Sequence, residues 1–214
     1  MTKKQSAARA PAGITLERVV AAAFDVLDRG GIAKLSTRAI AAELGVSMNT
    51  VMWHIRTKDR LLELMAEAIA GEVSLEGLRG EWHEQAAELL RRLRRAMLGH
   101  RDGGRIVAGT SPAEPHTLAF ADRLVTVLGR GCPTPRAAAW TLWSLFYFVL
   151  GLVQEEQAAH TEWHDRLRVT VAERRLPALG AVLAEFTSDD FDGRFEFGIG
   201  QILRSAPEAQ APTS

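Results

Sequence analysis

Polar side chains at the start of a short apolar stretch near the N-terminus have the chemistry that reads DNA bases. Asn49 can form two hydrogen bonds with adenine, and Thr50 can reach a phosphate or the methyl group of thymine. They follow Ser47 and Met48 in the run SMNTVMWHI. When a helix enters the major groove, the residues of its first turn face the bases. We therefore expect DNA contacts from Met48, Asn49 and Thr50, with a solvated surface as the alternative for each.

Two short helices joined by a tight turn must position these residues, and residues 36–55 have the pattern for them. The Ser36 hydroxyl can cap the first helix, and Ser47 can cap the second. Gly45 can end the first helix, because glycine takes a left-handed backbone without a steric clash. The pattern predicts a helix-turn-helix, whose second helix fits the major groove. An ordinary helical hairpin is the alternative that this pattern alone leaves open.

A third helix is expected over residues 15–28, where apolar residues recur at helical spacing and Gly30 and Gly31 follow. It should brace the other two, giving a three-helix DNA-binding domain over residues 14–60. Residues 1–13 form a basic arm that is too poor in apolar residues to fold alone, so we expect it to be disordered. The arm either touches phosphates or the minor groove, or is a loose terminus.

The residues that follow resemble the signature of the tetracycline-repressor (TetR) family of transcription regulators. Residues 50–65 read TVMWHIRTKDRLLELM, and in that family the recognition helix ends in an aromatic residue and a histidine, before a turn, a lysine and a leucine-rich helix. Trp53, His54 and Lys58 occupy those positions here. Residues 35–47, LSTRAIAAELGVS, are similar to the preceding helix of the family.

The resemblance implies further contacts with DNA. Trp53 and His54 should lie against the sugar-phosphate backbone, and Lys58 should contact a phosphate. Met52 departs from the family, which usually has tyrosine there, and offers only apolar contact. The residues expected to contact DNA are Thr37, Arg38, Ser47, Met48, Asn49, Thr50, Met52, Trp53, His54 and Lys58.

Composition predicts an all-helical, soluble, cytoplasmic protein. The 214 residues are rich in Ala, Leu, Glu and Arg, with few alternating β-branched runs. The single cysteine, Cys132, cannot form an internal disulfide, and the N-terminus has no apolar segment typical of a signal peptide. The net charge is zero, but residues 1–65 hold ten Lys/Arg and six Asp/Glu, whereas residues 66–214 hold sixteen and twenty. A basic N-terminal part favours a nucleic-acid surface there.

The rest of the chain, residues 61–205, is predicted to be a helical ligand-binding and dimerisation domain, followed by a disordered tail over residues 206–214. Helices are expected over residues 61–75, 84–99, 137–153, 176–186 and 191–203, with a loop and a short helix within 100–115. Residues 137–153 are apolar and just long enough to span a membrane, but their aromatic and hydroxyl residues favour a buried helix and no membrane. Small residues in the last helix would allow the close approach of helices at a dimer interface.

Residues 100–114 and 151–157 resemble the ligand domain of the tetracycline repressor, which implies a cavity for a small molecule. That repressor holds a magnesium-bound drug with a histidine where this chain has Val107, and it has arginine where this chain has Ser111. Two other drug-contacting positions align with Ser74 and Leu89, and only Glu155 keeps the acidic partner. We therefore expect an effector other than tetracycline. The residues expected to contact it are Ser74, Leu89, Leu93, Val107, Thr110, Ser111, Pro112, Trp143, Tyr147, Leu150 and Glu155.

Together these features predict a ligand-responsive repressor that binds a palindromic operator as a homodimer. One alternative is a DNA-binding dimer whose core is only structural. Another is a helical enzyme using His100, Asp102 and Glu155, which lacks a nucleophile–base spacing or a phosphate loop. His160 and His164 could share a helical face as metal ligands, but no third ligand is evident, so no metal and no cofactor are expected. We expect both in a connection between helices.

Overall fold

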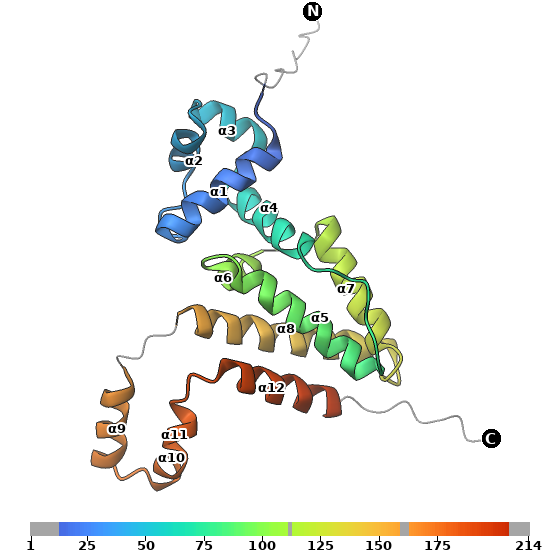
Figure 1. Cartoon of the computed structure of the whole chain (residues 1–214), viewed down its shortest axis with the longest axis vertical. Helices are drawn as coiled ribbons and strands as arrows, with labels where there is room; N and C mark the ends of the chain where they lie inside the picture. The colour runs from blue at the N-terminus through green and yellow to red at the C-terminus, as the bar shows by residue number, and fades with distance from the viewer. Residues whose placement is uncertain (1–12, 111–112, 159–162, 206–214) are drawn as a thin grey trace, which may run out of the picture.

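The computed structural model describes residues 13–110, 113–158 and 163–205, and every regular element in these ranges is a helix (Figure 1). The predicted arm up to residue 12, the predicted tail and the residues Ser111, Pro112 and His160 lie outside the described residues. The helices are α1 Leu16–Gly30, α2 Thr37–Leu44, α3 Met48–Ile55, α4 Lys58–Gly71, α5 Trp82–Leu98, α6 Gly103–Ala108, α7 Pro115–Leu128, α8 Pro135–Gln157, α9 Trp163–Glu173, α10 Pro177–Ala181, α11 Leu183–Phe186 and α12 Phe191–Ser205.

The first three helices form the small N-terminal domain that the sequence predicts. The Ser36 hydroxyl accepts a hydrogen bond from the Ala39 backbone N–H (3.2 Å), which caps α2, and Ser47 caps α3 in the same way. Gly45 ends α2 in the left-handed region at φ 66°, where a Cβ would be strained. The helix-turn-helix prediction is therefore confirmed, and its turn is built by the residues that the sequence singled out.

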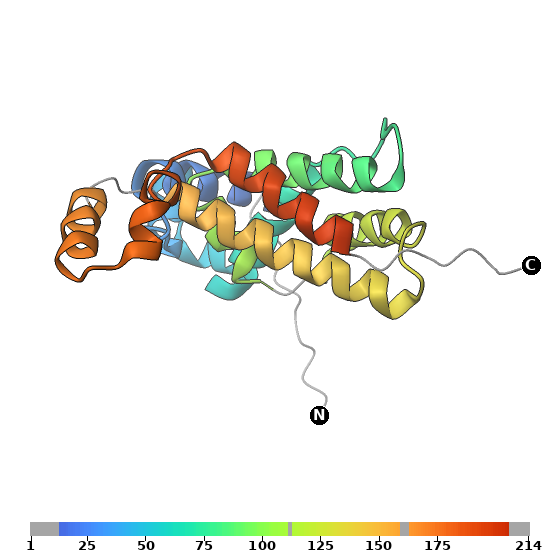
Figure 2. The same ribbon diagram turned by 90° about the horizontal axis from the view of Figure 1, so that it is seen from below.

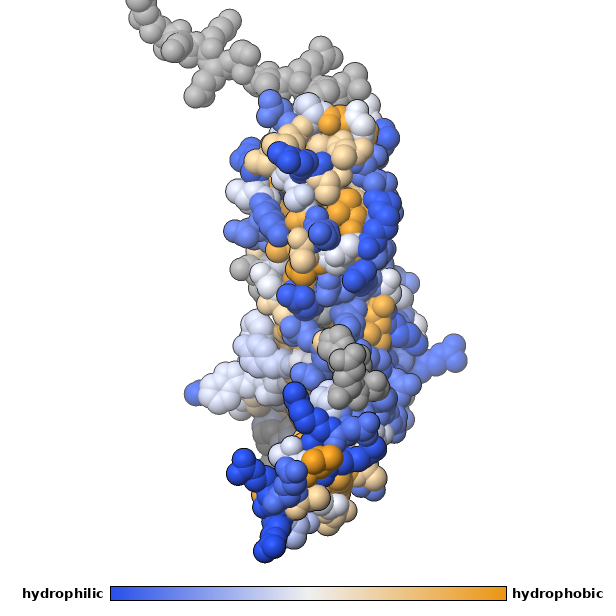
Figure 3. All heavy atoms as spheres, turned by 90° about the vertical axis from the view of Figure 1, so that its left-hand side faces the viewer, coloured by the Kyte–Doolittle hydropathy of each residue, from blue (hydrophilic) through white to orange (hydrophobic). Residues whose placement is uncertain are grey.

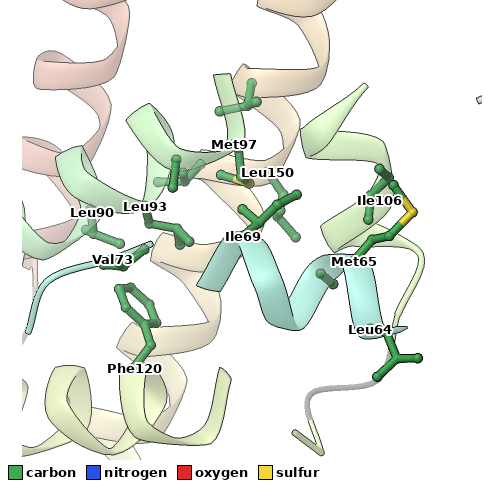
Figure 4. Packing of buried hydrophobic residues seen from close by; sticks show 14 of the residues in the cluster. Leu64, Met65, Ile69, Val73, Leu90, Leu93, Met97, Ile106, Phe120 and Leu150 are labelled. Carbon is green, nitrogen blue, oxygen red and sulfur yellow. The ribbon is translucent and has the colours of Figure 1, made fainter. Parts of the chain in front are cut away.

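The helix α4 leads from this domain into the body of the molecule (Figure 1). The Thr57 side chain caps its start, as a residue of that type before a helix favours. It ends at Gly71 rather than at residue 75, because the chain then runs irregularly through Gly77 and Gly80, both at positive φ. Figure 4 shows Met65 and Ile69 of α4 among side chains from the helices of the body.

The body consists of α5, α6, α7, α8 and α12 around one apolar core that continues into the N-terminal domain. The helices α8 and α12 lie side by side (Figure 2). Gly198 of α12 faces the ring of Phe148 on α8 so closely that a Cβ would overlap the ring. The sequence predicts such small residues at a dimer interface. In the structure, Gly198 permits the close approach of α12 to α8 within one chain.

The long helix α8 is apolar and long enough, by length and composition alone, to cross a membrane. It packs on α5, α6, α7 and α12 instead, as the core helix of a soluble protein does. The prediction that this helix is buried holds for only part of its surface within one chain. Trp140 and Tyr147 are 59% and 64% exposed.

The segment after α8 differs most from prediction. The prediction of one helix over residues 176–186 is wrong, because the helix is interrupted at Val182 (φ −116°, ψ 17°) and α10 and α11 are separate. None of their residues is buried, so no packed face selects a continuous helix. His164 lies in α9 and not in a connection, and α9 stands apart from the body in Figures 1 and 2. Figure 3, viewed from this side, shows hydrophobic residues in patches separated by hydrophilic ones.

Candidate DNA-reading surface and ligand cavity

The helix α3 presents its first turn to solvent while its opposite side is anchored in the core. Val51 and Ile55 are fully buried, whereas Met48 and Asn49 are exposed. The hydroxyl groups of Ser47 and Thr50 are 3.0 Å apart and share a hydrogen bond. The side chains predicted to face bases are therefore available to a partner, and the cap fixes the backbone that carries them.

The start of α2 lies beside the middle of α3, which brings the other predicted contacts onto the same surface. The Thr37 hydroxyl lies 3.7 Å from the sulfur of Met52. The rings of Trp53 and His54 meet edge to face with centroids 4.8 Å apart. Of the two predicted cations, Arg38 lies on α2 and Lys58 begins α4, and both are exposed.

Two features of this surface were not predicted. Arg56 ends α3 with φ 58°, a conformation that non-glycine residues rarely adopt, and its exposed side chain borders a shallow hollow with Trp53 and His54. Its position between His54 and Lys58 in the sequence is the signal that could have identified it. The Nε2 atom of His54 is buried and has no hydrogen-bond partner among the described residues.

A cavity of about 370 Å³ lies in the body between α4, α5, α6, α7 and α8. This volume is within the range of about 300–1,000 Å³ typical of small-molecule sites. Its walls are mostly aliphatic and aromatic, with two threonines and one glutamine in addition to the polar groups of the Tyr147 and Trp143 rings. The residues that line it are Ala66, Ala70, Leu93, Val107, Ala108, Thr110, Thr117, Phe120, Trp143, Phe146, Tyr147, Leu150, Gly151 and Gln154.

The cavity contains six of the residues predicted from the resemblance: Leu93, Val107, Thr110, Trp143, Tyr147 and Leu150. Ser74 and Leu89 lie elsewhere: Ser74 is exposed and accepts a hydrogen bond from Arg92 through its carbonyl oxygen (2.8 Å), and Leu89 is fully buried in the core. Glu155 is exposed and also outside the lining, although it lies one helical turn beyond Gly151 on the same side of α8.

Several lining residues were missed by sequence reasoning. Thr117 and Phe120 come from α7, a helix that was not predicted, so their place in a wall could not be inferred. Gly151 and Gln154 continue the spacing of Tyr147 and Leu150 along α8, and that helical period was a usable signal.

The described lining contains no Asp, Glu, His, Lys or Arg, but one carboxylate stands directly behind it. Glu67 of α4 accepts hydrogen bonds from the backbone N–H of His116 (2.7 Å) and of Thr117 (3.1 Å), and from the Thr117 hydroxyl (3.1 Å). Burial alone would raise the pKa of Glu67, but these bonds and the nearby His116 lower it below its ordinary value. The carboxylate therefore stays charged at neutral pH and fixes the start of α7 to α4.

The short helix α6 connects the cavity with the N-terminal domain. Its end carries Val107 and Ala108 in the cavity wall. At its start, Asp102 adopts φ 55° and its Oδ2 accepts a hydrogen bond from the backbone N–H of Ile32 (2.8 Å). The Arg101 side chain donates to the carbonyl oxygens of Asp28 (3.2 Å) and Arg29 (3.4 Å). A displacement of α6 by a ligand would therefore act directly on the end of α1.

Metal ions have no evident site in the part of the chain that the structure describes. No group of three or more His, Cys, Asp or Glu residues converges there. His100, which the enzyme alternative would use, instead pairs with Glu72 (2.7 Å) and packs on the ring of Phe24.

Comparison with known proteins gives matches along nearly the whole chain. The family described as bacterial regulatory proteins, tetR family, matches residues 19–65, and the tetracyclin repressor-like C-terminal domain matches residues 76–204. The class A tetracycline repressor protein from transposon 1721 of Escherichia coli is 33% identical over 188 residues, covering 86% of this chain and 87% of that protein.

Solved structures agree with these matches. A possible TetR family transcriptional regulator from Streptomyces coelicolor A3(2) is 36% identical, with a TM-score of 0.81, covering 89% of this chain and 97% of that one. The TetR family protein ActR of Streptomyces coelicolor, in complex with actinorhodin, is 30% identical with a TM-score of 0.83, covering 91% and 97%. The likeness thus includes both the exposed helix α3 and the helices that enclose the cavity.

Proposed function

Because this chain belongs to the TetR family of bacterial regulatory proteins, we propose that it is a cytoplasmic homodimeric repressor that releases a palindromic operator when a small molecule other than tetracycline enters its cavity. Membership of this family of transcription regulators also excludes the enzyme alternative. The observation that carries the proposal is the position of α6. This helix forms part of the cavity wall at one end and holds the N-terminal domain at the other.

The exposed aromatic side of the body supports a homodimer. Trp140 of α8 is 59% exposed, and Phe197 of α12 is 67% exposed. Two helices from each of two copies would bury these rings in a four-helix interface, which large exposed apolar side chains favour. A two-fold axis there would place two copies of α3 on one DNA face, where half-sites lie about 34–36 Å apart.

The cavity chemistry supports an effector other than tetracycline. The E. coli relative is a tetracycline repressor, whereas the ActR structure holds actinorhodin. Magnesium prefers oxygen ligands, usually carboxylates, and a carboxylate or an imidazole would help to hold a metal-bound drug. The described lining offers neither, and Val107 stands in its wall. A ligand can act on the operator complex only through different affinities for the two conformations.

Gel-shift titration with palindromic sequences from the DNA flanking the gene tests the proposal. We expect one dimer per palindrome, with weaker binding to scrambled duplex of the same composition, and loss of the complex on adding an effector. A monomer in sedimentation, or equal affinity for scrambled duplex, would contradict it. Specific binding that no cavity ligand alters would favour the DNA-binding dimer with a structural core.

Replacing Lys58 with alanine should weaken binding to all DNA sequences alike. Lys58 is exposed at the start of α4, next to the reading helix, where its charge can displace one counterion from a phosphate. We expect the slope of log affinity against log salt to fall by about 1. Arg166→Ala, which removes an exposed charge on α9, is the matched control and should leave the slope unchanged. An unchanged slope in Lys58→Ala would remove Lys58 from the contact surface.

A further inference from the structure

We propose that the effector is an uncharged, flat aromatic molecule with hydroxyl groups, which lies against Trp143 and Tyr147 and extends over Gly151. The inference rests on the proposed function, because it names the chemical class of ligand for the same cavity. Three independent properties of the lining support it: the arrangement of the rings, the lack of charge, and the direction of the hydrogen bonds.

The rings form a shelf along one side of α8. Trp143 and Tyr147 are one helical turn apart and stack with centroids 5.4 Å apart and planes 28° apart. Phe146 meets Trp143 edge to face at 6.0 Å. Aromatic molecules bind such faces in offset stacks or edge-to-face contacts, which saturated rings cannot form.

The shelf ends in open space. Gly151 is one turn beyond Tyr147 and lines the cavity, and no atom lies within 4 Å of the position that its Cβ would occupy. A side chain there would continue the row of rings and fill this space. The missing side chain leaves room for a flat molecule to continue along α8 past Tyr147.

The described walls contain no charged side chain, and the next carboxylate in the row of Tyr147 and Gly151, Glu155, is exposed one turn beyond Gly151 and outside the lining. An unpaired charge in an apolar site costs much more free energy than a neutral polar group. The Glu67 carboxylate is behind Thr117, and its oxygens already accept bonds from two backbone N–H groups and a hydroxyl, while His116 Nδ1 lies 2.7 Å from Oε1. These contacts occupy the carboxylate, so it cannot serve a cation in the cavity.

The threonine and glutamine side chains of the lining are left mainly with acceptor atoms, whereas the Tyr147 hydroxyl and the Trp143 indole N–H can donate. The hydroxyl of Thr110 donates to the carbonyl oxygen of Val107 (3.1 Å), and that of Thr117 donates to Glu67. Each hydroxyl has one proton, so both oxygens offer only lone pairs to a ligand. Gln154 donates one of its N–H bonds to Leu150 (3.1 Å) and keeps its carbonyl oxygen. Such a site favours a ligand whose polar groups both donate and accept hydrogen bonds, as phenol hydroxyls do.

A matched series of probes tests the three properties separately by calorimetry on the full chain at pH 7. The reference is 2-naphthol, which is flat, neutral and a donor. We expect decahydro-2-naphthol, which is not flat, to bind about fivefold more weakly. The analogue without a donor, 2-methoxynaphthalene, should also bind about fivefold more weakly. The anion 2-naphthoate and the cation 2-naphthylmethylammonium should bind at least about tenfold more weakly.

Two variants locate the site. Gly151→Leu fills the open space on α8 and should weaken 2-naphthol binding at least about tenfold, since the leucine would occupy the volume that the ligand needs. Thr126→Leu places leucine at an exposed position of α7 outside the lining and should change nothing. Trp143→Leu keeps an apolar side chain but removes one of the rings, so it should reduce the preference for 2-naphthol over its saturated analogue. Thermal melting of each variant checks that it is folded.

Equal or tighter binding of the saturated or charged probes would overturn the inference, as would unchanged 2-naphthol binding in folded Gly151→Leu. Failure of every probe to bind a protein that still binds its operator would overturn the ligand class and leave the DNA-binding proposal intact. Tight, Gly151-dependent binding of 2-naphthol that leaves the operator complex unchanged would support the ligand class and contradict ligand-controlled release.

Discussion

Arg94→Ala is expected to lower the free energy of unfolding by about 3 kcal/mol, because it breaks an ion pair with Glu156 in which both side chains are mostly shielded from water. The Arg94 side chain is 11% exposed and donates two hydrogen bonds to Glu156 of α8 (2.8 and 3.0 Å) and one to Asp192 of α12 (2.5 Å). It also lies over the ring of Phe195, 5.1 Å from its centroid. Burial alone would lower the pKa of Arg94, but both carboxylates raise it, so the group is charged throughout the accessible pH range.

The neighbouring arginine supplies the control for this experiment. Arg95 is 68% exposed on the same helix and has only a distant contact with Glu88 (3.5 Å), so Arg95→Ala should change stability by less than about 0.5 kcal/mol. Urea unfolding followed by circular dichroism measures both. Equal effects of the two substitutions would show that the Arg94 network does not hold α12 to α5 and α8.

Gly103→Ala should destabilise the protein by about 3 kcal/mol, because the added Cβ would overlap the backbone carbonyl oxygen of Met97. That oxygen belongs to the last turn of α5, so relief requires the start of α6 to move away from it. Since Asp102 and Arg101 hold the N-terminal domain from this same start, the variant should also bind operator more weakly at temperatures where it remains folded.

Gly151→Ala is the control, because it makes the same chemical change in a helix where the added Cβ meets nothing within 4 Å. Replacing glycine by alanine at such a helical position stabilises by about 0.5–1 kcal/mol. The two variants should therefore shift the midpoint of thermal unfolding in opposite directions. A Gly103→Ala protein that is as stable as the parent chain would show that the α5–α6 joint tolerates displacement.

The N-terminal domain could be predicted closely because local interactions determine where its helices begin and end. Ser36, Gly45 and Ser47 each fix one helix end through bonds within four residues, and those bonds do not depend on the remainder of the fold. The segment α9–α11 could not, because it has almost no buried residues and thus no apolar period to reveal where its helices stop.

The cavity was predictable only in part, for a geometric reason. Resemblance identified the wall of α8 and α6 because these runs are continuous in sequence, and Trp143, Leu150 and Val107 line the cavity as expected. It assigned Glu155 to the same wall, and the helical period does place this residue one turn beyond Gly151, but the lining of α8 ends at Gly151 and Gln154. Thr117 and Phe120 enter from α7, whose approach to α8 is set by long-range packing that a single sequence does not reveal.

The joint between α6 and the N-terminal domain makes that domain exchangeable. Its hydrogen bonds on the domain side go mainly to backbone groups, namely the N–H of Ile32 and the carbonyl oxygens of Asp28 and Arg29. The side chains in the joint are Asp28, which accepts a bond from the Arg101 N–H, and Phe24, whose ring packs on His100. Most of the joint would therefore survive amino-acid replacement in α1, α2 or α3. A new DNA-reading helix could therefore arise by mutation, or be grafted from a relative, and α6 would still connect it to the ligand cavity. Operator choice and effector choice can in this way evolve separately in one polypeptide.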